Sequence, residues 1–196
     1  MASSMYKRGG FAEQTHFIGI PVSIELEELV AECREHMSCV YGCHSGYGTP
    51  PHITLIPPFA LADGLESRDL LEAAYSAAEE CKAQNLLPLQ VEVCGFGCFS
   101  ERTLFANVKD SDAWQKLHSL FCKKISSALP ASVKKSGKSF YPHLTIANRD
   151  IPTGAMDEAL KHFSQLNLNE SFTADSIAIY MRNSTGGWKE WQRIGC

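Results

Sequence analysis

Two short stretches of the chain repeat one pattern of residue types that can carry acid–base chemistry. Residues Pro51–Leu55 read Pro-His-Ile-Thr-Leu, and residues Pro142–Ile146 read Pro-His-Leu-Thr-Ile. Their histidines, His52 and His143, lie 91 positions apart. The chain has seven histidines, so only about 0.3 His-x-Thr pairs are expected by chance, and the matching flanks make two copies rarer still. We interpret the pattern as an internal duplication with a pseudo-two-fold axis.

The spacing within each copy has a direct meaning on a β-strand. Residues two positions apart point to the same face, so His52 shares a face with Thr54, and His143 shares one with Thr145. If the two strands are neighbours, the imidazoles and hydroxyls converge on one cleft. Two histidines can divide the roles of general acid and general base near neutral pH, and hydroxyls can hold anionic oxygens. This set suits attack at a phosphodiester and needs no metal ion.

A single His-x-Thr pair on a strand would be weak evidence, because such a pair is most often a surface feature of residues that favour strands. Two matching copies favour a functional interpretation.

Composition limits the classes of protein to which the chain can belong. The 196 residues, 44% of them hydrophobic, are typical of a folded domain, and the net charge of -4 argues against a binder of duplex nucleic acid. No apolar run is long enough to cross a membrane, and the N-terminal residues lack the apolar core of a secretory signal. The chain has eight cysteines, which we expect to be mostly reduced, in the cytoplasm.

A metal site is the alternative interpretation of the cysteines. Cys39, Cys43 and His44 lie close together in the sequence, but no second ligand pair at zinc spacing follows them. We therefore expect no metal and no other cofactor.

The order of expected elements predicts an α+β fold rather than a doubly wound parallel sheet. We expect one domain over residues 1–196, with residues 1–12 flexible. Strands are expected at 14–22, 52–56, 89–99, 102–108, 141–147, 171–182 and 188–194, and helices at 24–40, 65–83, 110–129 and 156–163.

At this point the sequence resembles the two-histidine (2H) phosphoesterase superfamily, which includes 2'-5' RNA ligase-like proteins and RNA 2',3'-cyclic phosphodiesterases. The signature of that family is two His-x-Thr/Ser motifs, each followed by an apolar residue, and both are intact here. The order of elements and the closing hairpin are also similar. The resemblance implies a bilobal, pseudo-two-fold fold with the active cleft between lobes, and phosphodiester chemistry on RNA ends or small nucleotides.

Carried over onto this sequence, the resemblance implies a role for each motif residue. We expect His143 to act as general base on water or a ribose hydroxyl and His52 to protonate the leaving oxygen. Thr54 and Thr145 are expected to bind the non-bridging oxygens of the phosphate.

Further candidates are weaker, and each has a structural alternative. Phe59 is a candidate for stacking on a base or for the core, and Arg149 for contacting a phosphate or solvent. Tyr141 shares a face with His143, where it lines the cleft or packs. The lysines of a basic loop are candidates for guiding RNA, although such loops are usually only solvated; they are Lys134, Lys135 and Lys138.

The expected partner is a small nucleotide or an RNA end, with no duplex DNA and no membrane. Within enzymes, a 2'-5' ligase or a 2',5'-oligonucleotide phosphodiesterase remains open as an alternative to a cyclic-end hydrolase. A nucleotide- or RNA-binding module on the same fold is the alternative of another class, although binding alone does not need paired histidines.

Overall fold

The computed structural model describes residues 14–133 and 139–196. The expected flexible residues 1–12 and the basic stretch with Lys134, Lys135 and Lys138 lie outside the described residues. In chain order the elements are β1 (His16–Pro21), α1 (Ile24–Tyr41), β2 (His52–Phe59), α2 (Ser67–Ala83), β3 (Leu89–Phe99), β4 (Thr103–Val108), α3 (Asp112–Ala128), β5 (His143–Asn148), α4 (Met156–Phe163), a 3-10 turn (Ser164–Leu166), β6 (Asn169–Ala174), β7 (Ser176–Arg182) and β8 (Trp188–Gly195).

The described strands form one eight-stranded antiparallel sheet in the order β6-β3-β4-β5-β2-β1-β7-β8. This arrangement confirms the predicted α+β class. At the centre of the sheet, β2 and β5 are joined through one residue pair, Ile53 with Leu144. The sheet therefore has two four-stranded halves that meet at the two motif strands.

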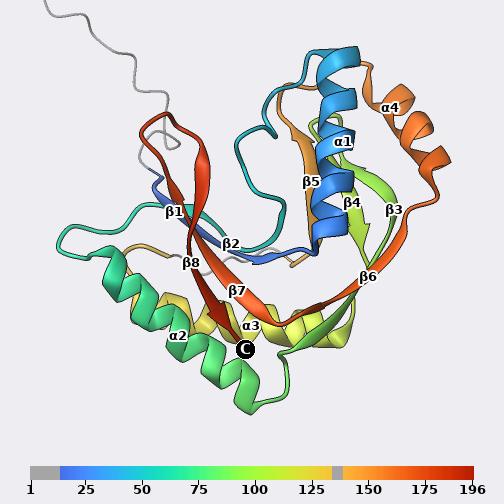
Figure 1. Cartoon of the computed structure of the whole chain (residues 1–196). Helices are drawn as coiled ribbons and strands as arrows, with labels where there is room; N and C mark the ends of the chain where they lie inside the picture. Colours follow the sequence, from blue (N-terminus) through green and yellow to red (C-terminus); the bar gives the residue numbers. More distant parts are fainter. Residues whose placement is uncertain (1–13, 134–138) are drawn as a thin grey trace, which may run out of the picture.

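The two halves repeat one pattern, as the duplicated motif predicts. β1-α1-β2 matches β4-α3-β5 in element order, and in the sheet β1 lies beside β2 just as β4 lies beside β5. Each connecting helix crosses to the other half, since α1 contacts β5 and α3 contacts β2. Figure 1 shows α1 alongside β5, with α2 and α3 at the other half. The crossing helices tie the halves together around a pseudo-two-fold axis.

The helices are held by amphipathic faces. On α1 the buried residues Leu26, Val30, Cys33 and Met37 recur at helical spacing and form one stripe. The larger hydrophobic cluster packs α2 and α3 against the β2 half, and a smaller one packs α1 and α4 against β5. Because both clusters lie behind the motif strands, the backbone that carries the histidines is firmly supported.

Two of the predicted strand boundaries were wrong. The expected strand at 52–56 continues to Phe59 through two prolines, because this end of β2 pairs only with β1 and its other edge needs no N–H donor. The expected single strand at 171–182 is divided at Asp175 into β6 and β7. β6 pairs with β3 and β7 with β1, in opposite halves of the sheet.

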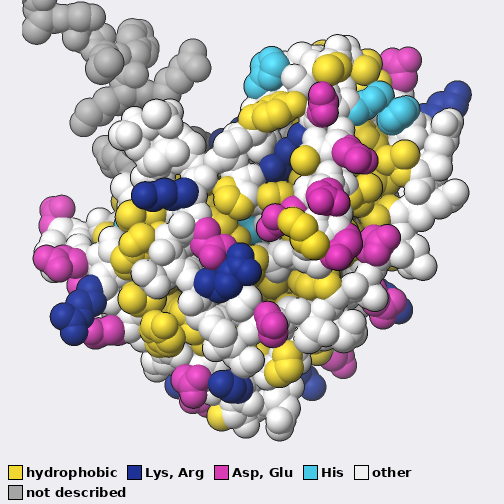
Figure 2. All heavy atoms as spheres, viewed as in Figure 1, with side chains coloured by type: hydrophobic (Ala, Val, Ile, Leu, Met, Phe, Trp, Pro, Cys, Tyr) yellow, Lys and Arg dark blue, Asp and Glu magenta, His cyan; other side chains and the backbone are white. Residues whose placement is uncertain are grey.

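The outer face of α1 carries acidic side chains, which gather along this helix in Figure 2. The exposed ones are Glu25, Glu28, Glu32 and Glu35. Such a face repels polyphosphates rather than attracting them.

Among residues 14–133 and 139–196, no helix combines the length and apolar character needed to cross a membrane.

Candidate active site

The two motif strands bring the four predicted catalytic residues together at the centre of the sheet. The flanking aliphatic residues are buried at 0–1% exposure, whereas the motif histidines and threonines are partly exposed on the opposite face. Because Ile53 pairs with Leu144 and the strands are antiparallel, His52 lies on the side of Thr145, and His143 lies on the side of Thr54. Each histidine therefore lies toward the threonine of the other motif.

Both histidine rings are held by the same hydrogen bond. The Nδ1 of His52 donates to the carbonyl of Pro50, and the Nδ1 of His143 donates to the carbonyl of Tyr141, at 2.7 Å in each case. A carbonyl oxygen can only accept, so the proton of each neutral ring is on Nδ1. Nε2 is then the atom that can accept or donate a proton in the reaction.

Close packing on β1 fixes the position of His52. A Cβ atom on Gly19 would come within 3.1 Å of His52 Cδ2 and 2.9 Å of the Ile53 carbonyl. Beyond the glycine, the imidazole lies 4.4 Å from the Phe17 ring and 5.1 Å from the Tyr180 ring, measured between centroids. The ring can occupy this place because residue 19 has no side chain.

His143 also lies against two aromatic rings, of which Phe105 is buried and Phe99 is open to solvent. Phe99 meets it edge-on at 4.9 Å and Phe105 at 5.2 Å. Phe99 also meets Tyr141 edge-on at 5.5 Å. Phe99 is 38% exposed and Tyr141 46% exposed, so an apolar surface borders the site on this side.

The electrostatics of the site favour neutral histidines. Burial lowers the pKa of His52 to about 4, and the charges of Arg34 and His143 add to this effect while the Pro50 carbonyl opposes it. Burial also lowers the pKa of His143, opposed by the Tyr141 carbonyl. At neutral pH both rings are therefore unprotonated, until a bound anion raises their affinity for a proton.

The loop between α1 and β2 connects the two halves close to the site. The Asp150 carboxylate accepts the main-chain N–H groups of His44 and Ser45 at 2.6 and 2.7 Å, and the Ser45 hydroxyl at 2.7 Å. Farther along, the Gly48 carbonyl accepts the N–H of Trp188 at 2.9 Å. The loop is thus fastened to the end of β5 on one side and to β8 on the other before it reaches the first motif.

The structure places the three predicted substrate-binding residues at different distances from the histidines along and beside the motif strands. The main-chain carbonyl of Tyr141 holds the His143 ring, while the Tyr141 side chain meets Phe99 and Phe105 edge-on. Phe59 does not lie beside the motif histidines: it is 7% exposed and packs in the main hydrophobic cluster, stacked beside His16. The prediction that Phe59 stacks on a base is therefore wrong, because the late part of β2 turns this ring into the core. Arg149 is exposed beyond the end of β5, six residues after His143.

Several residues of the site carried no signal in the sequence. Gly19 and Phe99 are far from both motifs along the chain and reach the histidines only through strand pairing. Arg34 reaches the motif strands only because α1 crosses to the other half of the sheet. A single sequence does not fix such long-range pairings.

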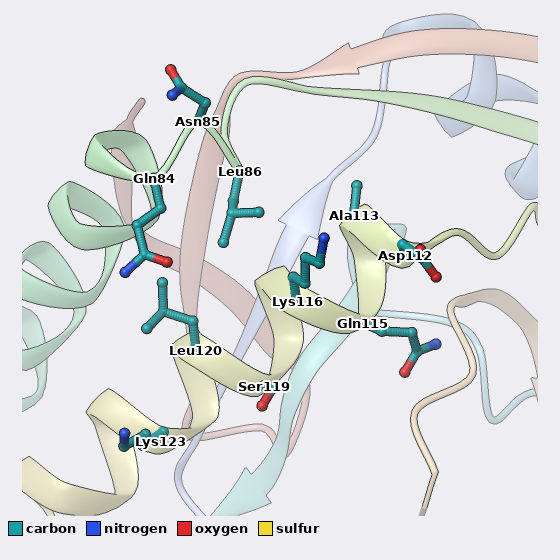
Figure 3. A pocket seen from close by; sticks show the side chains of 10 residues that line it. All are labelled: Gln84, Asn85, Leu86, Asp112, Ala113, Gln115, Lys116, Ser119, Leu120 and Lys123. Carbon is teal, nitrogen blue, oxygen red and sulfur yellow. The ribbon is translucent and has the colours of Figure 1, made fainter.

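A separate groove of about 880 Å³ lies away from the histidines, between the end of α2 and the first turns of α3. Its lining includes Gln84, Leu86, Lys116 and Lys123 (Figure 3) and none of the motif residues. Within residues 14–133 and 139–196, no three His, Cys, Asp or Glu side chains are placed to hold a metal ion together.

The comparison with solved structures finds the same fold in distant proteins. The protein TT0787 of Thermus thermophilus matches with a TM-score of 0.63 at 15% identity, over 92% of this chain and 97% of that one. E. coli LigT complexed with 3'-AMP matches with a TM-score of 0.61 at 12% identity, over 93% and 97%. The MHV ns2 PDE domain matches with a TM-score of 0.51 at 13% identity, over 93% and 99%. No curated protein sequence matches the chain significantly.

The sequence itself carries the family assignment. The model of the 2'-5' RNA ligase superfamily matches residues 20–186, a span that includes both motif strands and both crossing helices. With the paired motifs on the two central strands of the sheet, the chain belongs to the 2'-5' RNA ligase superfamily of two-histidine phosphoesterases.

Proposed function

We propose that the protein is a phosphodiesterase that acts without a metal ion on 2',3'-cyclic phosphates or 2'-5' linkages of RNA or nucleotides. One observation carries the proposal: both motif histidines are held through Nδ1 by the same carbonyl hydrogen bond, which reserves Nε2 for proton transfer. Thr54 and Thr145 lie on the same face and can donate to the non-bridging oxygens of a phosphate.

The roles of the histidines follow from their environments, and here we depart from the expectation based on sequence. In the complex with the substrate, the base must be unprotonated and the acid protonated, so the histidine that takes up a proton more readily suits the role of acid. Burial together with Arg34 disfavours a proton on His52 more strongly than burial disfavours one on His143. We therefore assign His52 as the base and His143 as the acid, the reverse of the roles expected above.

With a cyclic phosphate, the Nε2 of His52 takes a proton from water as the water oxygen bonds to phosphorus. The bond from phosphorus to the 2'- or 3'-oxygen breaks, and the Nε2 of His143 gives its proton to that oxygen. The product is a 3'- or 2'-phosphate. With a 2'-5' linkage, the neighbouring 3'-hydroxyl replaces water, and the 5'-oxygen leaves with the proton from His143.

The open aromatic surface formed by Phe99 and Tyr141 can hold the base of the substrate. Aromatic rings stack on bases with little dependence on sequence, and the Phe99 ring contacts both His143 and Tyr141. A small nucleotide as ligand is supported by the solved complexes of E. coli LigT with 3'-AMP and with ATP. The name of the superfamily also supports the 2'-5' ligase reaction as a second candidate.

The test is a panel of small substrates incubated with purified protein in EDTA. The panel holds nucleoside 2',3'-cyclic phosphates, a 2'-5' dinucleotide and its 3'-5' isomer, and includes a ligation assay with 2',3'-cyclic and 5'-hydroxyl ends. We expect turnover that disappears in the double variant His52→Ala/His143→Ala. Turnover that survives in the double variant would overturn the proposed mechanism. Saturable binding of the same compounds without turnover would favour a binding module.

A further inference from the structure

The two halves of the fold differ at one half-buried position of the crossing helices. Arg34 and Cys122 are each the eleventh residue of their crossing helix, counted from Ile24 and Asp112. Each side chain donates to a main-chain carbonyl of the opposite motif strand. Arg34 Nη2 reaches the Thr145 carbonyl at 3.2 Å, whereas the Cys122 thiol reaches the corresponding strand of the other half at 3.7 Å. A cation therefore supports one side of the site and a neutral thiol the other.

Arg34 also contacts the segment that leads into the first motif. Its Nη1 donates to the Thr49 carbonyl at 2.7 Å. Thr49 directly precedes Pro50, whose carbonyl holds the ring of His52. One planar guanidinium thus joins the backbone that orients His52 to the backbone of Thr145 in the second motif. Among the described residues, β2 and β5 pair directly only at Ile53 with Leu144, so this bridge adds to a sparse connection.

The surroundings of the guanidinium are shaped to admit it. A Cβ atom on Gly46 would come within 2.9 Å of Arg34 Nε and 2.5 Å of the Ile146 carbonyl. Nε itself is buried without a hydrogen-bond partner. An unpaired buried donor lowers stability, so the stability of the fold alone does not account for an arginine at this position.

We propose that Arg34 is a positioning residue of the candidate active site, which sets the arrangement of the two motifs through its bridge from Thr49 to Thr145 and keeps a positive charge beside His52. This inference rests on the proposed phosphodiesterase function for its kinetic consequences, but its effect on His52 can be measured without any substrate.

Several titratable groups act on Arg34 and on His52. Burial lowers the pKa of Arg34 to about 10 while Cys33 and Tyr47 act in the opposite direction, so the guanidinium stays cationic at neutral pH. The charges that act on His52 are those of Arg34 and His143, and both lower its pKa. Removal of the Arg34 charge must therefore raise the pKa of His52.

Two variants separate the charge from the bridge. Arg34→Lys keeps a cation but cannot span both carbonyls with a planar fork, whereas Arg34→Met removes both the cation and the bridge. Arg68→Met is the control, because Arg68 is an exposed arginine on α2 that pairs with Glu72. Each variant is measured for kcat and KM on the best substrate of the panel, and for the titration midpoint of His52 by NMR of ¹⁵N-labelled histidine.

We expect kcat to fall about 10-fold in Arg34→Lys and about 100-fold in Arg34→Met, because small displacements of catalytic groups have effects of this size. KM should change less than kcat. The His52 midpoint should rise in Arg34→Met and stay in place in Arg34→Lys, with no change of either quantity in Arg68→Met.

The outcomes distinguish this inference from the proposed function. A wild-type protein without turnover would contradict the function, while a raised midpoint in folded Arg34→Met would still support the role of Arg34. Folded Arg34→Met with the wild-type midpoint and wild-type kcat would overturn the inference. If Arg34→Met does not fold, Arg34→Lys decides the question. An unchanged kcat in Arg34→Lys would overturn the positioning role of the bridge. A reduced kcat with an unchanged His52 midpoint would support it.

Discussion

His52 and His143 stand in opposite halves of the sheet, yet each donates its Nδ1 proton to the carbonyl of the residue two positions earlier in the chain, over 2.7 Å. In each case the acceptor carbonyl belongs to the residue before the proline of the motif, and a proline favours extended backbone at the residue that precedes it. The repeated proline thus helps to orient the carbonyl that holds the histidine ring. This equivalence gives the proline of each copy a structural role beside the His-x-Thr triplet.

Each motif histidine should be needed individually for activity. In His52→Asn or His143→Asn the side-chain amide can still donate to the same carbonyl, but it cannot transfer a proton. We expect kcat/KM to fall about 1,000-fold in each variant, as is typical for the loss of a general acid or base. The control is His162→Asn, which changes an exposed histidine on α4. Near-wild-type turnover of both motif variants would contradict the mechanism.

The lack of a side chain at Gly19 should also be needed for full activity, because the His52 ring packs against this residue. In Gly19→Ala the new methyl group would meet His52 Cδ2 at 3.1 Å and the Ile53 carbonyl at 2.9 Å, so the ring or the strand must shift. We expect kcat to fall about 10- to 100-fold. Gly195→Ala on β8 is the matched control, because a Cβ there meets no atom within 4 Å. Equal activity of the two glycine variants would show that this packing does not position His52.

The sequence predicted the parts of the site that depend on local periodicity. The two-residue spacing placed His52 and Thr54 on one face of β2, and the repeat predicted a second strand of the same kind. Most helix positions followed from apolar spacing in the same way. The burial of Phe59 in the core could not be predicted, because the two prolines before it suggested that the strand had ended. The bridge of Arg34 could not be predicted either, because it depends on α1 crossing to β5.

The lowered pKa of His52 should appear in the pH dependence of stability. The ordinary pKa of 6.5 falls to about 4 in the folded protein, so between these values the unfolded chain binds more protons than the folded one. The contribution of His52 to the free energy of unfolding is therefore complete above pH 6.5 and is lost as the pH falls toward 4. Other buried histidines titrate as well, so the informative quantity is the difference between wild type and His52→Asn. In urea titrations from pH 7.5 to 4, the free energy of unfolding of the wild type should decrease relative to that of His52→Asn as the pH falls. A constant difference would mean that His52 titrates normally.

The aromatic surface beside His143 should act on the base of the substrate and not on the phosphate. Phe99 is 38% exposed and meets both Tyr141 and His143 edge-on, so Phe99→Ala removes a face on which a base can stack. Loss of one stacking contact is typically about 1–3 kcal/mol, which corresponds to a rise in KM of roughly 5- to 150-fold. A ribose cyclic phosphate that lacks the base should show little change. Tyr75→Ala is the control, because Tyr75 is similarly exposed, at 47%, but lies on α2. If KM rises equally for both substrates in Phe99→Ala, the ring supports the position of His143 rather than the base, because only a stacking contact can distinguish the two compounds.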